Sequence, residues 1–335
     1  MSRTSKQLTG ASVGLALVAV LIYESGPAAI LSDLKLIGRG LLAIIAIEFV
    51  VDFFNTLGWL FTLPAHHRRG QVGRLFLVRL AGTALNQAIP VASMGGEPTK
   101  VFLLRSHLPI QTAVASVVVS RFAFSVAKAI FIFAGIATTA SLINLRPGII
   151  VALVVGFVAT LSGVVLFLIL QLRGLSTASA RIMARMHISQ RWISSISQIS
   201  PEVDHEIAEF YRSRRGDLAA AILSHQAAFL CGVCQVLLLL GWMGLTRNWR
   251  VGLAIESLST LFAFASFLVP DSIGIKEGGI ALTFSALALP VSAGLAVAIA
   301  FRITSLVGTL VGLLVMSALL TRLPAGTAKQ LEQER

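Results

Sequence analysis

Six long apolar runs constrain this chain more than any other feature of its sequence. Each is long enough to cross a hydrocarbon layer of about 30 Å at about 1.5 Å per helical residue. They cover residues 8–24, 37–63, 110–141, 147–172, 218–245 and 291–320. Only 13% of the 335 residues are charged, too few to cover a globule of this size in water. The sequence therefore predicts an all-α, polytopic integral membrane protein with one transmembrane domain, residues 1–335, and excludes a water-soluble enzyme or a disordered chain.

The loops between these runs differ in charge, and the net charge of the chain is +12. If the N-terminus is cytoplasmic, the segments richest in Lys and Arg share its side: 64–74, 100–108, 173–217 and the tail after 321. The positive-inside rule selects this orientation, which also makes the C-terminus cytoplasmic. Residues 173–217 are predicted to form a cytoplasmic, interfacial helical loop. Its second helix is predicted to begin near Ser200, Pro201 and Glu202.

Two weaker apolar regions, 75–107 and 251–289, are interrupted by Pro and Gly and predict two broken or re-entrant hairpins. Matched positions recur at fixed spacings: Pro90, Glu97, Pro109 and Arg121 in the first copy, and Pro270, Glu277, Pro290 and Arg302 in the second. Three apolar runs separate the two regions, so the copies enter the membrane from opposite sides. We therefore predict an inverted repeat of residues 75–141 and 251–320, an architecture typical of secondary transporters, which bind substrate near the midplane.

Each copy is predicted to hold a Glu and an Arg at the same depth. Glu97 and Arg121 each lie twelve residues from Pro109, and Glu277 and Arg302 lie thirteen and twelve from Pro290. Twelve residues correspond to about 18 Å, near the middle of the membrane. An unpaired charge there costs about 2.5–3.5 kcal/mol, so we expect ion pairs or a wet cavity. These charges are candidates for stapling the hairpins to the following helices, for binding substrate, or for both.

Glu48 and Asp52 share one face of the second apolar run. Two acids one turn apart repel unless a proton or cation lies between them, so they are candidates for proton or cation coupling. Salt bridges to Arg79 or Lys128 are the alternative. Lys128 also lies two turns after Arg121, and this basic stripe suits a phosphate head group better than an apolar solute.

Two glycine-rich stretches, 93–100 and 271–279, suggest half-helices whose exposed amides favour an anion. Close packing is the alternative role for their glycines. The predicted substrate-binding residues are Asn86, Glu97, Lys100, Arg121, Lys128, Lys276, Glu277 and Arg302, and the predicted hairpin turns contain Pro90, Gly95, Gly96, Pro270 and Gly274. There is no Walker A sequence, nucleophile elbow or clustered metal-ligand pattern, so we expect no cofactor, no metal and no nucleic-acid partner.

The stretch from Asn86 through Gly95-Gly96-Glu97 to Arg105, with the later Pro270–Gly279 block, resembles the flippase-like membrane family named for the transmembrane region of lysylphosphatidylglycerol synthases. That family includes stand-alone members linked to hopanoid and glycolipid pathways. The resemblance covers nearly the whole chain and implies that the protein moves amphipathic lipids between leaflets of a bacterial inner membrane. The family's motif positions correspond to Asn86, Pro90, Gly95, Gly96, Glu97, Arg105, Pro270, Gly274 and Glu277.

We therefore expect a lipid transporter whose inverted hairpins meet at a polar midplane cavity, where Arg121, Lys128, Lys100 and Arg302 hold an anionic head group. Since the chain ends at Arg335, no soluble aminoacyl-transferase domain and no aminoacylation are expected. Two alternatives stay open: a membrane-embedded transferase acting on lipid-linked substrates, with Glu97 or Asp52 as base, and a scaffold that holds a lipid-biosynthesis enzyme through residues 173–217. The expected partners are membrane lipids and such pathway enzymes.

Overall fold

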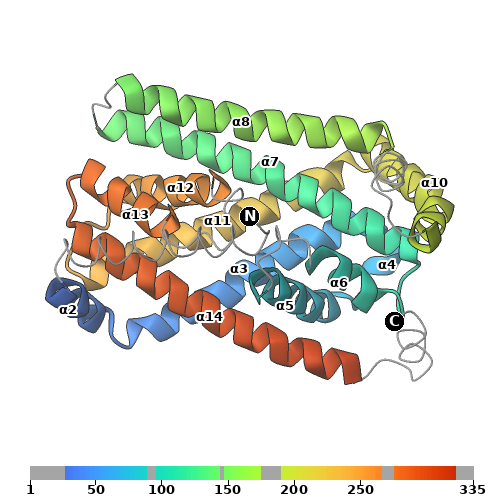
Figure 1. Ribbon diagram of the computed structural model, residues 1–335, viewed down its shortest axis with the longest axis horizontal. Helices are drawn as coiled ribbons and strands as arrows, with labels where there is room; N and C mark the ends of the chain where they lie inside the picture. Colours follow the sequence, from blue (N-terminus) through green and yellow to red (C-terminus); the bar gives the residue numbers. More distant parts are fainter. Residues whose placement is uncertain (1–26, 89–95, 144–146, 175–189, 266–274, 322–335) are drawn as a thin grey trace.

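The computed structural model describes residues 27–88, 96–143, 147–174, 190–265 and 275–321, and the part that it describes is helical (Figure 1). The helices are α2 (Pro27–Ile37), α3 (Gly40–Thr62), α4 (Ala65–Arg68), α5 (Val72–Ala88), α6 (Gly96–Leu104), α7 (Ile110–Leu142), α8 (Pro147–Leu172), α10 (Gln190–Ser213), α11 (Arg215–Trp242), α12 (Trp249–Ala265), α13 (Ile275–Ala286) and α14 (Val291–Thr321). The predicted all-α, polytopic membrane fold is confirmed.

Five helices, α3, α7, α8, α11 and α14, are long and apolar enough to cross a membrane. They match five of the six predicted runs, and the sixth, 8–24, lies outside the described residues. The outer faces of α8 and α14 expose apolar side chains, including Val155, Leu166, Leu306 and Leu314. Such faces are stable in contact with lipid and not with water, as expected of a multi-pass membrane protein.

The two broken regions form short helical hairpins. α6 has 9 residues and α13 has 12, so they rise about 14 and 18 Å, well short of a bilayer core of about 30 Å. The start of α5 and the end of α6 meet in one apolar cluster, which includes Leu75 and Leu104. Ile255 of α12 and Phe284 of α13 share a second cluster. Each hairpin therefore returns to the end of the bundle where it began, and Figure 1 shows the two hairpins at opposite ends.

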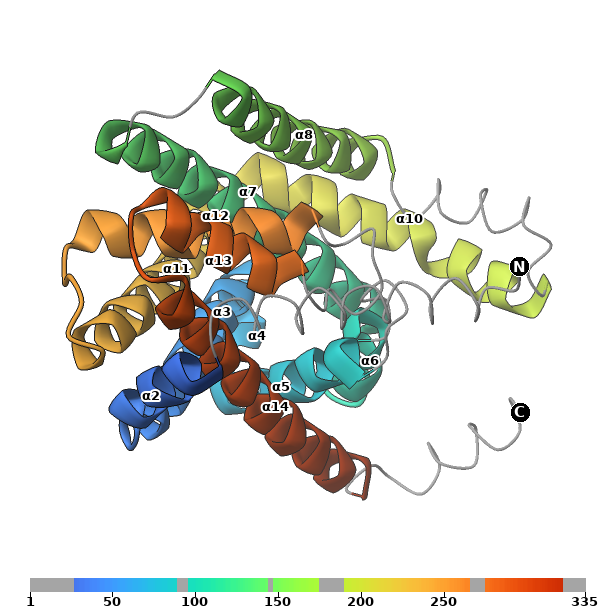
Figure 2. The ribbon, with the colours of Figure 1, turned by 60° about the vertical axis from the view of Figure 1, so that its left-hand side comes forward.

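The two halves of the bundle pack against each other in a crossed pattern. α5 lies along α14, the long helix of the second half, and α12 lies along α7, the long helix of the first. α3 and α11 make the most extensive pairing, while α2 packs on α14 as α10 packs on α7 (Figure 2). α3, α5, α6 and α7 thus have counterparts in the same order about 180 residues later, in α11, α12, α13 and α14. This packing supports the predicted inverted repeat, which stays a prediction, and suggests that α2 and α10 belong to it.

Local sequence explains how the short hairpin helices begin and end. Pro109 and Pro290 immediately precede α7 and α14, where a missing N–H costs nothing. α13 ends in a Schellman-type turn, in which the Leu289 N–H donates to the Phe284 carbonyl at 2.9 Å and Ala288 has a φ of 56°. α6 approaches α5 at a pair of glycines: a Cβ added to Gly96 would lie 2.1 Å from the Gly82 carbonyl oxygen. Glycines are required for this contact.

The segment between α8 and α11 departs from prediction at its proline. α10 runs without interruption from Gln190 to Ser213, with Pro201 inside it, so no second helix begins at Ser200. Proline removes one backbone hydrogen bond and need not end a helix that tertiary packing supports. The support comes from Val203, Ile207 and Phe210, which are buried against α7. The first half of the predicted hairpin, up to residue 189, lies outside the described residues.

Candidate functional site

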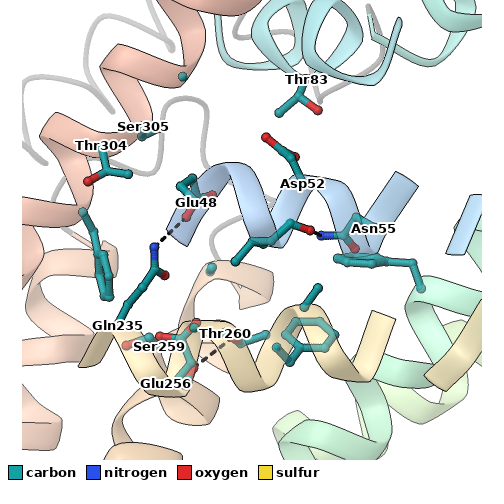
Figure 3. Close-up of a pocket in the computed structure, with 18 of the residues that line it drawn as sticks. Glu48, Asp52, Asn55, Thr83, Gln235, Glu256, Ser259, Thr260, Thr304 and Ser305 are labelled. Atoms are coloured by element: carbon teal, nitrogen blue, oxygen red, sulfur yellow. Dashed lines mark hydrogen bonds between the residues drawn. The ribbon is translucent and has the colours of Figure 1, made fainter. Parts of the chain in front are cut away.

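A polar cavity of about 350 Å³ lies where the two halves of the bundle meet. α3, α5 and α7 line it from the first half, and α11, α12 and α14 line it from the second (Figure 3). The main apolar clusters lie toward the two ends of the bundle, on either side of it. The cavity is therefore near the middle of the bundle, between its two halves. This is where a predicted inverted repeat would place a substrate site.

Among the described residues, five ionisable side chains line this cavity: Glu48, Asp52, Arg79, Lys128 and Glu256. Arg79 donates a hydrogen bond from Nε to Asp52 Oδ1 at 3.1 Å, and both side chains are largely buried. Asp52 thus forms the salt bridge that was the alternative to a role in coupling. The two acids of α3 have different partners, since Glu48 Oε2 accepts a hydrogen bond from a glutamine on α11 at 3.1 Å.

Lys128 of α7 supplies a positively charged side chain to this cavity. Its ammonium lies over the ring of Phe124, 5.0 Å from the centroid, and it forms no salt bridge to a carboxylate in the described part of the chain. An aromatic ring stabilises a cation by about 0.5–2 kcal/mol without neutralising its charge. The positive charge of Lys128 is therefore directed at whatever enters the cavity.

A smaller pocket of about 40 Å³ adjoins the cavity and shares Arg79 and Phe124 with it. Here Glu97 accepts hydrogen bonds from Lys100 Nζ at 3.0 Å and from Arg121 Nη2. The Lys100 side chain is only 7% exposed, so its charge is largely withdrawn from solvent. This three-residue group ties the first turn of α6 to α7, so Glu97 and Arg121 lie level with each other. Their depth in a membrane stays a prediction.

The second hairpin repeats this ion pair. Arg302 Nη2 of α14 donates to Glu277 Oε1 of α13 at 2.8 Å. Each Glu lies in the first turn of a short helix, and each Arg is the twelfth residue of the long helix that follows. Both pairs therefore have the geometry of staples between hairpin and helix. A role in substrate binding in addition stays a prediction.

The structure does not gather the predicted substrate-binding residues in one cavity. Of that set, Lys128 lines the large cavity, whereas Glu97, Lys100 and Arg121 line the small pocket. Asn86 caps a helix instead, because its Oδ1 accepts a hydrogen bond from the Gly96 N–H at 2.6 Å. That bond uses one of the α6 amides predicted to bind an anion.

Four predicted turn residues and one predicted substrate-binding side chain lie outside the described residues. They are Pro90, Gly95, Pro270 and Gly274, and the side chain of Lys276. Arg121 and Lys128 do share the inward face of α7, as the stripe predicts. What differs is that the long Arg121 side chain extends to α6 while Lys128 reaches the cavity.

Several residues that line the cavity have no role predicted from the sequence. Gln235 and Ser259 are buried polar side chains that line the cavity beside Glu256. The sequence predicts Arg79 only as a possible salt-bridge partner of an acid on α3. One feature of the sequence indicates this part of the cavity: Glu256 is an acid within an otherwise apolar segment. A second feature is a pair of threonines at equivalent positions of the predicted repeat. Thr83 on α5 and Thr260 on α12 both line the cavity.

Comparison with known protein families identifies the same family that the motif residues resemble. The family described as the lysylphosphatidylglycerol synthase transmembrane region matches residues 7–312. The chain belongs to this family. The match includes both hairpins, every helix that lines the cavity and both Glu–Arg pairs. No match was found among curated proteins or among solved structures. Membership of the lysylphosphatidylglycerol synthase transmembrane-region family indicates a lipid-related function for this multi-pass membrane protein.

Proposed function

We propose that this protein moves an amphipathic lipid with an anionic head group between the leaflets of a bacterial inner membrane. The observation that carries the proposal is the polar cavity between two inverted halves, lined by charged residues at mid-depth. Charged residues inside a membrane bundle are costly and mark substrate or ion pathways. The lipid-related family supports the same class of substrate.

The size of the cavity fits a head group better than a whole lipid. A volume of about 350 Å³ is at the lower end of small-molecule pockets. Two acyl chains do not fit in such a space, so they remain in the bilayer while the head group crosses through protein. This separation removes the main barrier to lipid flipping, which is the cost of placing a polar head group in hydrocarbon.

Lys128 is the residue that we assign to the anionic group of the head. A lysine ammonium is a compact point charge that binds phosphate oxygens. Arg79 faces the same cavity, but its guanidinium is already engaged with Asp52. The head group therefore contacts Lys128 first, and the Asp52–Arg79 pair lies ready to exchange partners as the phosphate moves.

The orientation follows from the charges at the two ends of the bundle. The end with α4 and α10 carries basic residues, including Arg68, Arg74, Arg105, Arg214 and Arg215, whereas the α2 end has fewer, among them Lys35 and Arg250. By the positive-inside rule we place the α10 end in the cytoplasm. The first hairpin then enters from the cytoplasm and the second from the opposite side.

Leaflet exchange in proteoliposomes tests the proposal. Fluorescent phospholipids with anionic and with neutral head groups are reconstituted with the wild type, with Lys128→Gln or with Lys128→Arg. We expect the wild type to exchange the anionic lipid, Lys128→Gln to slow this exchange at least about tenfold, and Lys128→Arg to retain most of it. A factor of ten corresponds to about 1.4 kcal/mol, less than one charge-assisted hydrogen bond.

The matched control is Lys35→Gln, which removes the same charge from an exposed position on α2, far from the cavity. This variant should exchange lipid at the wild-type rate. Equal exchange by folded Lys128→Gln and wild type would reject the assignment of Lys128. No exchange of any lipid by folded wild-type protein would reject the transport proposal itself and favour the transferase or scaffold hypotheses.

A further inference from the structure

We infer that the small pocket beside the cavity binds a neutral hydroxyl group of the lipid head, and that His225 is the residue that selects it. His225 of α11 lines this pocket together with residues of α3, α5, α6 and α7. The inference rests on the proposed function for its substrate, a lipid with an anionic head group. It adds which head groups the protein prefers, namely those that carry a hydroxyl beyond the phosphate, as glycerol does.

Hydrogen bonds to α3 fix the tautomer of His225. Asn55 Nδ2 donates to the Val51 carbonyl at 2.9 Å, so the other atom of this amide, Oδ1, is available as an acceptor. His225 Nδ1 lies 2.8 Å from Asn55 Oδ1 and therefore carries the proton. In the neutral imidazole the second ring nitrogen, Nε2, then holds a lone pair and acts only as an acceptor.

The lone pair of Nε2 points to a ligand. His225 is 1% exposed, and its Nε2 makes no hydrogen bond within the described part of the chain. Gly58 of α3 leaves this nitrogen uncovered, since a Cβ added there would lie 2.6 Å from it. The Nδ1 edge of the ring is turned to Asn55, which lines the large cavity, so the rest of the ring, with Nε2, faces the small pocket. A buried acceptor without a donor is uncommon in folded proteins, and a bound donor satisfies it.

The charges around the small pocket select the kind of donor. Its described wall carries three cationic side chains, of Arg79, Lys100 and Arg121, and the acid Glu97. Glu97 is itself engaged by Lys100 and Arg121. The cations repel an ammonium group, and they keep the imidazole neutral for the same reason. An ionised phosphate oxygen has no proton to donate to Nε2. A hydroxyl donates to Nε2 and accepts from a cation, so it is the group that matches both.

The size and position of the small pocket suit the end of a head group. Its volume of about 40 Å³ holds one group the size of a water molecule. Phe124 lies between the two sites: its ring centroid is 5.0 Å from the Lys128 ammonium and 5.3 Å from the centroid of the His225 ring, so these two groups are within about 10 Å of each other. A glycerol head group whose phosphate is at Lys128 can therefore extend its terminal hydroxyl past Phe124. Water has the same hydrogen-bonding chemistry, so the test compares lipids that differ only in hydroxyl groups.

Lipid binding is measured on the purified, full-length protein in detergent by native mass spectrometry, with phosphatidylglycerol and phosphatidylpropanol in competition. The two lipids have the same charge and the same three head-group carbons, and they differ in the hydroxyls of glycerol. We expect the wild type to bind phosphatidylglycerol at least about fivefold more tightly, the factor that one hydrogen bond supplies. Equal binding would overturn the inference, in favour of a water molecule that stays in the pocket. Tighter binding of phosphatidylserine, which has the same net charge and an ammonium group, would overturn it as well.

The variant His225→Phe keeps an aromatic ring beside Phe124 and removes the acceptor. It should bind the two lipids equally, with the affinity that the wild type has for phosphatidylpropanol. The matched control is His205→Phe, the same change at an exposed position on α10, which should keep the preference for phosphatidylglycerol. Folded His225→Phe with the wild-type preference would overturn the assignment of His225. The comparison of lipids on the wild type needs no variant, so it decides the matter even where His225→Phe does not fold.

Leaflet exchange of the same two lipids separates a failure of this inference from a failure of the proposed function. A preference for phosphatidylglycerol in binding, without exchange of either lipid, would leave the hydroxyl site standing and reject transport. Equal binding and equal exchange of the two lipids would reject the hydroxyl site and leave transport standing. Folded wild-type protein that binds neither lipid would reject both.

Discussion

Gly96→Ala should destabilise the protein by opening the first hairpin. The added Cβ would lie 2.1 Å from the Gly82 carbonyl oxygen and 2.5 Å from Asn86 Cγ. Carbon atoms make favourable contacts at about 3.5–4.0 Å, so α6 must move away from α5 by more than about 1 Å. That movement breaks the hydrogen bond from the Gly96 N–H to Asn86. Overpacking costs about 1–3 kcal/mol and the lost bond about 1 kcal/mol, so we expect a loss of about 2–4 kcal/mol.

The measurement is reversible unfolding of purified protein, followed by helix content during titration with a denaturing detergent. Gly163→Ala in α8 is the matched control, because a Cβ at Gly163 meets no atom within 4 Å. In a helix that replacement stabilises by up to about 1 kcal/mol. Gly96→Ala with a free energy of unfolding equal to or above that of the wild type would refute the steric argument. The rate of leaflet exchange by Gly96→Ala should fall at least in proportion to the loss of folded protein.

The remaining predictions concern the second hairpin and α10. Arg302→Glu and Glu277→Arg should each lower the unfolding free energy by about 2 kcal/mol, and the double exchange should recover part of it, measured in the same titration. If the changes in unfolding free energy of the two single variants simply add in the double variant, the ion pair does not contribute to stability. Burial raises the pKa of Tyr211, whose hydroxyl donates to Gln171 at 2.5 Å. As pH rises, the Tyr211 hydroxyl therefore loses its proton in the unfolded state before it does so in the folded state. The unfolding free energy should fall as pH rises above about 10, and Tyr211→Phe should remove this dependence. An unchanged pH profile would contradict the assignment.

The sequence alone determined which segments are long and apolar enough to cross a membrane, and which charges lie level with each other. Hydropathy and the rise per residue are local properties, so the limits of α3, α7, α11 and α14 agree closely with the predicted runs. Three apolar runs separate the two hairpins, and this odd number predicts that the hairpins enter the membrane from opposite sides. Equal spacing about Pro109 was enough to place Glu97 level with Arg121, and the two form an ion pair.

Only the tertiary structure decided which of these groups share a cavity. The position of a residue along a helix gives its depth, but its direction around the axis depends on which neighbours pack there. Lys100 and Arg121 converge on Glu97, whereas Lys128 reaches the cavity with residues from five other helices. Helix packing likewise carries α10 through Pro201. The crossed pairing of the two halves brings Gln235 and Ser259 into the same cavity as Lys128. Contacts between segments far apart in sequence leave no local pattern, so the sequence alone did not predict this arrangement.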